Sequence, residues 1–170
     1  MNPTKFKVGD KIVDFGRVYR IFKIDNTTEN DTIIYFKPYF KSKKDGGMTC
    51  SIPAKSINKT NIRRPINKLR MNKILKNLSK KTFANDINDI NVLEITEAKE
   101  VLSINKAGKT AKILKRLWLE KQDESKNFTK SKETAFKHLI ERLSEEIAYA
   151  GNTSIENAEA KIRSALKKAT

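Results

Sequence analysis

Few residues in this chain have the types and spacing that catalysis requires. The segment 107–110, Ala-Gly-Lys-Thr, is similar to the end of a phosphate-binding P-loop, in which backbone N–H groups and a lysine hold nucleotide phosphates. That motif needs a glycine five residues before Gly108, where this chain has Ser103. It also needs a preceding strand, whereas the pattern there predicts a helix. The sequence therefore argues against a nucleotide hydrolase.

Metal and nucleophile chemistry have no better support. His138 is the only histidine and Cys50 the only cysteine, so no zinc site of the usual ligand spacing can be assembled. We interpret His138 as a residue on the flank of a helix and Cys50 as a small apolar residue in a strand. One cysteine allows no internal disulfide, which is typical of a reducing cytoplasm.

Two pairs of adjacent carboxylates complete the search for chemistry. Asp123-Glu124 and Glu145-Glu146 are interpreted as helix or loop surface, because neighbouring residues on a helix do not converge on one substrate. We therefore expect no catalytic residues, no metal and no cofactor, and a protein that is not an enzyme.

The charge of the chain points to its partners instead. The formal net charge is +16, with a pI near 9.9. Such a chain repels its own copies, so we expect a monomer, and it attracts polyanions, with nucleic acid or an anionic membrane first. No apolar run approaches the roughly 18–20 residues of a transmembrane helix. The first residues contain no apolar segment typical of a signal peptide. We expect a cytoplasmic, nucleoid-associated protein without a membrane partner.

The pattern of residues in the first third of the chain predicts strands. Alternating apolar residues predict strands at 11–13, 18–24, 33–40 and 48–53, with a hairpin turn at Asp45-Gly46-Gly47. Four or five short strands without a helix suggest a small barrel that closes to hide its edges. Eight of the thirteen aromatic residues lie in 1–40. They are interpreted as core, and a base-stacking surface is the alternative.

The pattern of residues in the rest of the chain predicts mainly helices. Segment 46–85 has no acidic residue. Within it, Pro65 begins a predicted helix whose apolar stripe is Ile66, Leu69, Ile74, Leu75 and Leu78. Its basic face is either a solvated surface or a surface for phosphates. Segment 82–90 is a predicted loop. Further helices are predicted at 91–103, 106–122 with Asn105 as its cap, 129–151, and after Thr153. The fold class is α+β, with domains at 1–62 and 63–170.

The order of these elements, together with several segments, resembles the CarD/CdnL family of bacterial transcription regulators. The family's N-terminal domain is shared with the transcription-repair coupling factor. The similar segments are Phe6–Val13, Met48–Ala54, Leu117-Trp118, Leu143–Ala148 and Ala158–Ile162. The resemblance implies a small Tudor-like β-barrel that pairs an edge strand with the RNA polymerase β subunit. It implies an all-α helical bundle that binds double-stranded promoter DNA, independently of sequence, near the upstream edge of the transcription bubble. The protein would thereby modulate the stability of the open complex.

The resemblance also implies two sets of contact residues. The polymerase-binding set is Ile24, Thr27, Thr28, Met48, Cys50 and Ser51. The DNA-binding set is Lys106, Lys109, Lys112, Lys115, Arg116, Lys130 and Lys132.

Two other functions compete with this hypothesis. A stand-alone nucleic-acid-binding protein, of nucleoid or RNA-binding type, would use the basic run from Lys55 to Lys81 and the aromatic residues. A protein-interaction adaptor would carry its charge for solubility alone.

Overall fold

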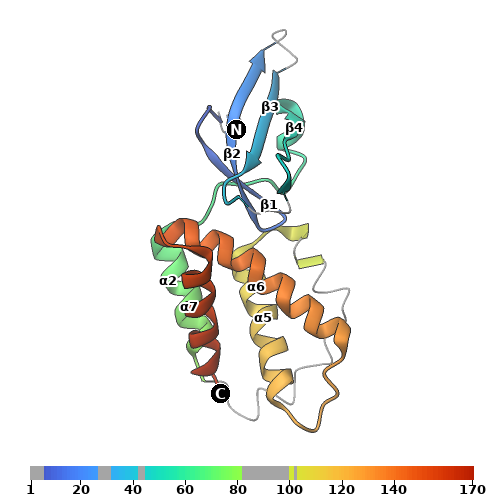
Figure 1. The fold of residues 1–170 in the computed structure, drawn as a ribbon, viewed down its shortest axis with the longest axis vertical. Coiled ribbons are helices and arrows are strands. Elements are labelled where there is room, and N and C mark those ends of the chain that lie inside the picture. Colours follow the sequence, from blue (N-terminus) through green and yellow to red (C-terminus); the bar gives the residue numbers. More distant parts are fainter. Residues whose placement is uncertain (1–5, 27–31, 42–44, 82–99, 102) are drawn as a thin grey trace.

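The chain forms a β-sheet followed by a group of helices (Figure 1). This computed structural model describes residues 6–26, 32–41, 45–81, 100–101 and 103–170. The sheet lies at one end of the elongated molecule and the helices at the other, with α6 crossing the top of the helical part next to the sheet (Figure 1). Sheet and helices have separate hydrophobic cores, which agrees with a two-part organisation.

The sheet contains four antiparallel strands in the order β1-β2-β3-β4. They are β1 (Lys11–Asp14), β2 (Arg17–Asn26), β3 (Thr32–Pro38) and β4 (Cys50–Pro53). The predicted strands are therefore confirmed. Between β3 and β4, the Met48 N–H donates to the Asp45 carbonyl at 2.5 Å. Both Gly46 and Gly47 have positive φ there, as a tight turn at this place requires.

The predicted barrel is wrong, because the described strands form an open sheet. The outer edge of β1 does not meet β4. It pairs with the segment that leads to the helices, where the Val13 N–H donates to the Arg63 carbonyl at 2.7 Å and the Arg63 N–H returns the bond at 3.2 Å. The segment 58–67, which we call the linker, thus pairs with β1 at Val13 and satisfies the backbone groups of that residue without closing the sheet.

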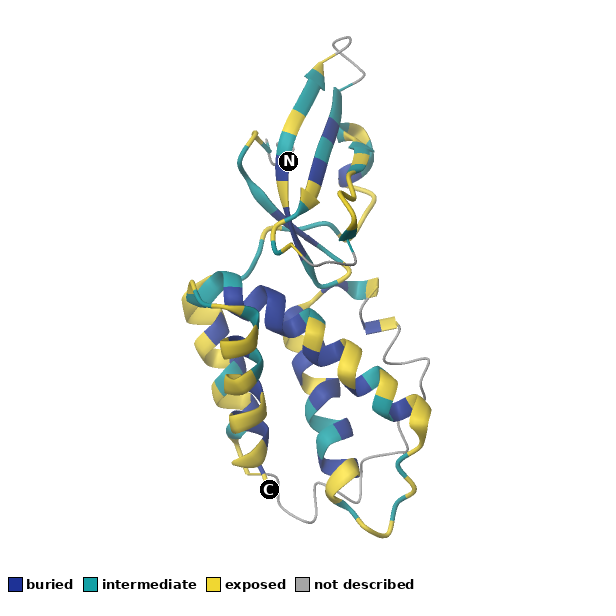
Figure 2. Cartoon of the chain, viewed as in Figure 1, coloured by how far each residue is buried: buried dark blue, intermediate teal, exposed yellow. Residues whose placement is uncertain are grey.

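One face of the sheet holds a small core (Figure 2). Its buried residues are Ile12, Tyr19, Ile21, Ile34, Phe36 and Ile57, the last from the short helix α1 (Ala54–Ile57). The rings of Tyr19 and Phe36 meet edge to face, with their centroids 5.3 Å apart. The core interpretation of the aromatic residues is confirmed for these two, whereas Phe15 is 57% exposed.

The described helices of the second part are α2 (Lys68–Ser79), α5 (Ala107–Gln122), α6 (Lys130–Gly151) and α7 (Ile155–Lys167). Side chains of Asn67, Thr129 and Ser154 cap α2, α6 and α7 by accepting backbone N–H bonds. The predicted cap at Thr153 is therefore displaced by one residue. The predicted loop 82–90 and most of the predicted helix 91–103 lie outside the described residues.

The helical core is larger than that of the sheet. Its fully buried side chains include Leu114, Leu139, Leu143, Ile147 and Ile162. They come from the predicted apolar faces of α5, α6 and α7, which agrees with 3.6-residue periodicity. The prediction fails at Leu69, which is 80% exposed on the outer side of α2.

No helix in the described part of the chain is both long enough and apolar enough to cross a membrane.

The turn between β1 and β2 offers a test of how closely the sheet approaches α6. Gly16 has φ +77°, and a Cβ added there would lie 2.8 Å from Cβ of Arg142. Because Cβ of Arg142 is bonded directly to the backbone, rotation of the side chain cannot move it away. We expect Gly16→Ala to lower the free energy of unfolding by about 2–4 kcal/mol, from backbone strain plus overpacking.

Gly9→Ala is the matched control, since Gly9 has φ +94° and no atom within 4 Å of the added Cβ. It should cost only the strain, about 1–2 kcal/mol. Urea unfolding of both variants measures the difference, and equal losses would contradict the close approach of the sheet to α6.

Candidate nucleic-acid and protein interfaces

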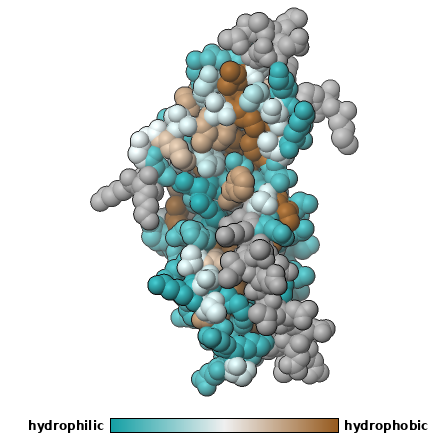
Figure 3. All heavy atoms as spheres, turned by 90° about the vertical axis from the view of Figure 1, so that its right-hand side faces the viewer, coloured by the Kyte–Doolittle hydropathy of each residue, from teal (hydrophilic) through white to brown (hydrophobic). Residues whose placement is uncertain are grey.

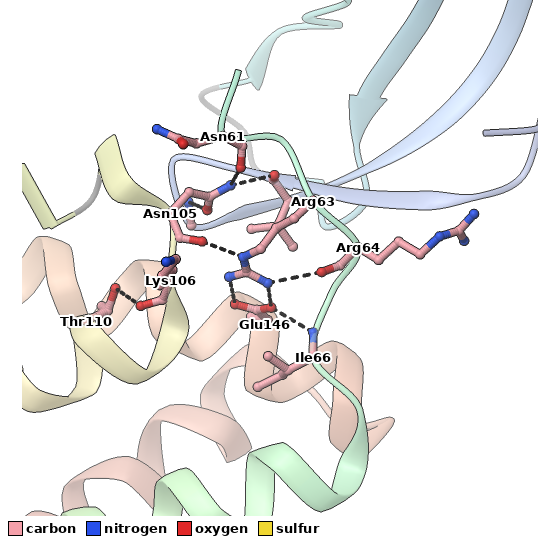
Figure 4. A network of polar contacts seen from close by, with 10 residues as sticks. Asn61, Arg63, Arg64, Ile66, Asn105, Lys106, Thr110 and Glu146 are labelled. Carbon is pink, nitrogen blue, oxygen red and sulfur yellow. Dashed lines mark hydrogen bonds and ion pairs between the residues drawn. The ribbon is translucent and has the colours of Figure 1, made fainter. Parts of the chain in front are cut away.

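A buried ion pair joins the sheet to the helices (Figure 4). Nη1 and Nη2 of Arg63, in the linker, donate to the two carboxylate oxygens of Glu146 on α6 at 2.5 and 2.8 Å. The same carboxylate accepts the backbone N–H of Ile66 at 2.8 Å. Glu146 is only 1% exposed. A paired fork of this kind fixes direction as well as distance, so it orients the linker on α6.

A second carboxylate on α6 holds the first turn of the sheet. One oxygen of Glu145 accepts from Nε of Arg17 at 3.2 Å and the other accepts the Val18 N–H at 3.0 Å. Two further N–H groups of Arg17 donate to Asp45 at 3.0 Å each. The bonds to Asp45, with the charge of Glu145, raise the pKa of Arg17, whereas burial raises the pKa of Glu145.

The side-chain amide of Asn105 makes a third set of contacts between the sheet, the linker and the helices. We call the contacts made by Arg17, Arg63, Asn105, Glu145 and Glu146 the joint. Its Nδ2 donates to the carbonyls of Val13 at 2.7 Å and Asn61 at 2.8 Å, and its Oδ1 accepts the Gly16 N–H at 3.0 Å. Asn105 has φ +55° and is 2% exposed. The sequence predicts this residue as a helix cap. In the structure it precedes α5 but bonds to the sheet instead, and Lys106 occupies the N-cap position without a side-chain bond.

The joint corrects our interpretation of Glu145-Glu146 as a surface pair. Both are buried, with Glu145 9% exposed. The signal was present in the spacing: Glu146 stands seven residues after Leu139 and three after Leu143, on the core face of α6. Carboxylates at such positions need cationic partners, which only the folded linker and sheet supply.

The structure leaves some of the predicted DNA-binding residues exposed and turns others inward. Lys106, Lys109, Lys112 and Lys130 are exposed, and Arg116 is half-buried. Nζ of Lys115 turns back to the carbonyls of Asn77 at 3.3 Å and Lys80 at 2.6 Å, near the end of α2. Burial and the charge of Lys80 lower the pKa of Lys115. DNA binding by the exposed members stays a prediction.

Lys132 is a correction within this set, because it is not available to a ligand. It is 6% exposed, and its ammonium pairs with the buried carboxylate of Glu120. The lysine therefore links α6 to α5. Its position three residues after the cap Thr129 gives no indication of burial, since the partner comes from another helix.

The predicted polymerase-binding residues are divided between two places. Thr27 and Thr28 lie outside the described residues. Ile24 is in the interior strand β2, paired with Ile34, and both line an apolar pocket of about 560 Å³. Met48, Cys50 and Ser51 lie in β4 or just before it. In the view of Figure 3, hydrophobic side chains gather over the sheet, whereas most of the other coloured side chains are hydrophilic.

Strand β4 is an edge strand. Within the described residues it pairs with β3 alone, in the register Phe36–Cys50 to Ile33–Pro53, and no backbone bond is made on its other side. Ser51 is exposed and Met48 is 38% exposed. An edge of this kind can accept a strand from another protein.

A groove between α2 and α7 carries basic residues that the predicted site omits. Its lysines are Lys76 from α2, Lys161 from α7 and Lys168 just after α7, all exposed. We call this feature the α2–α7 groove. The sequence identifies Lys76 as part of a basic face, but it does not show that α7 lies beside α2.

No metal centre is evident in the part of the chain that the structure describes. It contains no group of three or more His, Cys, Asp or Glu that could hold an ion. His138 is exposed on α6 with its Nδ1 3.7 Å from Glu141, and Cys50 is a half-buried free thiol, as their interpretations from sequence required. Nothing among these residues indicates an enzyme.

The fold and the sites define a class: a two-part α+β protein in which buried ion pairs join a small open sheet to a basic helical part. Comparison with known proteins does not place the chain in a family within this class, since no family model and no curated protein matches it.

The joint predicts an asymmetry between two glutamates of α6. Glu146→Gln removes the charge that Arg63 faces, so we expect a loss of about 2–4 kcal/mol in the free energy of unfolding. Glu141→Gln removes the same charge from an exposed position on the same helix and should change stability by less than about 0.5 kcal/mol. Chemical denaturation followed by circular dichroism measures both. Equal effects would refute the importance of the pair.

The pKa of Glu145 predicts a pH dependence. Because its pKa is raised in the folded state, its protonated form favours folding. Its contribution is therefore full below the unfolded-state pKa and is lost as pH rises through the folded-state pKa. We expect the stability of the natural protein, relative to Glu145→Gln, to fall as pH rises above 4.5, the ordinary pKa of a glutamate. A relative stability that rises over this range would contradict the desolvation of Glu145.

Proposed function

We propose that this protein is a CarD-like, non-enzymatic regulator of transcription. It binds the RNA polymerase β subunit through the sheet and duplex DNA, independently of sequence, through the helices, and so modulates the stability of the open complex. The observation that carries the proposal is the combination of an unpaired strand edge at β4 in the sheet and exposed lysines on the helices, which Arg63 and Glu146 hold together. The collinear resemblance described above supplies the identity of the partners.

The polymerase half of the proposal rests on β4. Strand addition needs an edge whose backbone groups are free, and the linker already occupies the outer edge of β1. This leaves two described edges that can accept a strand, β4 with Met48, Cys50 and Ser51, and the part of β2 beyond Ile21. Ile24 lies on the second of these edges, since it pairs with Ile34 of β3 on one side and β1 does not reach it on the other, and its side chain lines the apolar pocket.

The DNA half rests on charge. Helices α2, α5 and α7 carry exposed lysines on their outer sides, in a chain of net charge +16. Lysine attraction to phosphates gives affinity without sequence preference and weakens steeply with salt. Both halves are required for tethering, since a protein that held only one partner could not stabilise their complex.

A stand-alone nucleic-acid-binding protein is the second candidate. It is favoured by the α2–α7 groove, which needs no polymerase to attract a polyanion. The two candidates differ in one respect, namely whether β4 has a protein partner.

A pull-down of the full chain with the polymerase β subunit tests the proposal. Ser51→Glu adds a charge to the exposed edge of β4 and should reduce retention at least about tenfold, because the charge must be desolvated in the interface. Ser131→Glu makes the same change at an exposed position in the first turn of α6 and should bind normally.

Open-complex lifetime on a promoter fragment gives the second readout, and it should change with the natural protein but not with Ser51→Glu. Absence of β-subunit binding by the natural protein would exclude the tethering function. Tight binding to bare DNA in that case would establish the stand-alone candidate.

A further inference from the structure

We propose that the α2–α7 groove is the site that holds the phosphodiester backbone of duplex DNA. This goes beyond the proposed function by moving the DNA contact from α5 and the start of α6, where the resemblance places it, to a different pair of helices. The proposal rests on the shape, the charge and the side-chain chemistry of the groove.

The shape follows from helix packing. Helices α2 and α7 lie side by side and run in the same direction, from the joint toward the C-terminus (Figure 1). Their buried faces meet through Met71, Ile74, Ala158 and Ile162 of the helical core. Outside this contact the surface is hollowed, with a volume of about 700 Å³. A cleft lined by charges of one sign concentrates their field more than a convex helix face does.

The charge of the groove is uncompensated. Of its described lining residues none is acidic, and the three lysines have no ion pair with any described residue. The nearby pair on α7 is directed elsewhere, because Glu159 binds Arg163 at 2.7 Å and neither residue lines the groove. On α2 the neighbouring sequence has no acidic residue at all from 46 to 85. The lysines therefore present their full charge to a ligand.

The spacing along α7 suits an extended polyanion. The exposed lining residues of α7, with Lys168 just beyond it, are Asn157, Ala160, Lys161, Ser164 and Lys168. Lys161 and Lys168 are seven residues apart, so they stand on one side of the helix, about 10 Å apart along its axis. Two cations spaced along the helix in this way can bind successive phosphates of a backbone.

The side chains between the lysines favour a duplex backbone over other polyanions. Asn157 and Ser164 are exposed hydrogen-bond donors of the kind that contact phosphate oxygens. Single strands are usually held by aromatic side chains that stack on bases, and the described lining residues include none. Membrane-surface helices insert bulky apolar residues, whereas the exposed apolar residue here is Ala160. The groove is therefore built to bind phosphates, without reading bases.

The test compares two triple variants of the full chain with the same change in charge. The groove variant is Lys76→Gln, Lys161→Gln and Lys168→Gln. The matched control is Lys7→Gln, Lys41→Gln and Lys137→Gln, three lysines that are also exposed and belong neither to the groove nor to the predicted DNA-binding set. Affinity for a duplex DNA fragment is measured by fluorescence anisotropy at several salt concentrations, and thermal unfolding checks that both variants are folded.

We expect the groove variant to lose at least about tenfold in affinity and to reduce the slope of log affinity against log salt by about 2.5 to 3, one phosphate contact per lysine. The control should change both quantities much less. Equal losses in the two variants would overturn the proposal, because affinity would then follow net charge alone. So would a larger loss in the control, or an unchanged groove variant.

Three further measurements complete the test. Acetylation footprinting should show that duplex DNA protects Lys76, Lys161 and Lys168 more than the α5 lysines, which requires no variant to fold. Tighter binding to single-stranded RNA than to duplex would overturn the assignment of the ligand. Groove-dependent binding to vesicles of phosphatidylserine and phosphatidylcholine, with duplex affinity unaffected by the groove variant, would do the same.

The test separates this proposal from the proposed function. Polymerase binding with an unchanged groove variant would overturn the groove and leave the regulator intact. Groove-dependent DNA binding without polymerase binding would support the groove as the DNA site and overturn the proposed function as a transcription regulator.

Discussion

The arrangement of this molecule depends on one constraint, the need to pair two carboxylates buried at the end of α6. Glu145 and Glu146 occupy a helix face that is mostly apolar, where an unpaired charge would cost several kcal/mol. Within α6, Arg142 lies 3.9 Å from Glu145. The hydrogen-bonded arginines come from outside the helices, Arg17 from the sheet and Arg63 from the linker. Docking of the sheet therefore supplies the bonds that compensate for burying both carboxylates.

The same constraint explains why the sheet is open. To reach Glu146, the linker must pass beside β1, and there Arg63 pairs its backbone with Val13 while its side chain turns to the helix. The strand edge that would close a barrel is consequently occupied by the residue that makes the joint. Within the described residues, the opposite edge, at β4, has no backbone partner.

Local sequence patterns predicted the strands and helices well, but they could not predict pairs of residues that are distant in sequence. Alternation and helical periodicity located the strands and helices because each depends on neighbours in sequence. Glu146, Asn105 and Lys132 were misassigned because their partners lie 83, 92 and 12 residues away in sequence, on elements whose packing a local pattern does not specify. For Glu146 the apolar spacing on α6 was a usable signal. For Asn105 there was none, since an asparagine before a helix is also a common cap.

Buried and exposed charges serve different purposes here, and salt separates them. The pairs in the joint are shielded from solvent, and ions screen such pairs far less than exposed ones. The lysines of α2, α5 and α7 face water, where attraction to a polyanion falls steeply as salt rises. A rise in ionic strength should thus release a bound polyanion before it loosens the joint. Glu145 and Glu146 of α6 face inward, toward Arg17 and Arg63, so these two acidic residues do not lie among the exposed lysines.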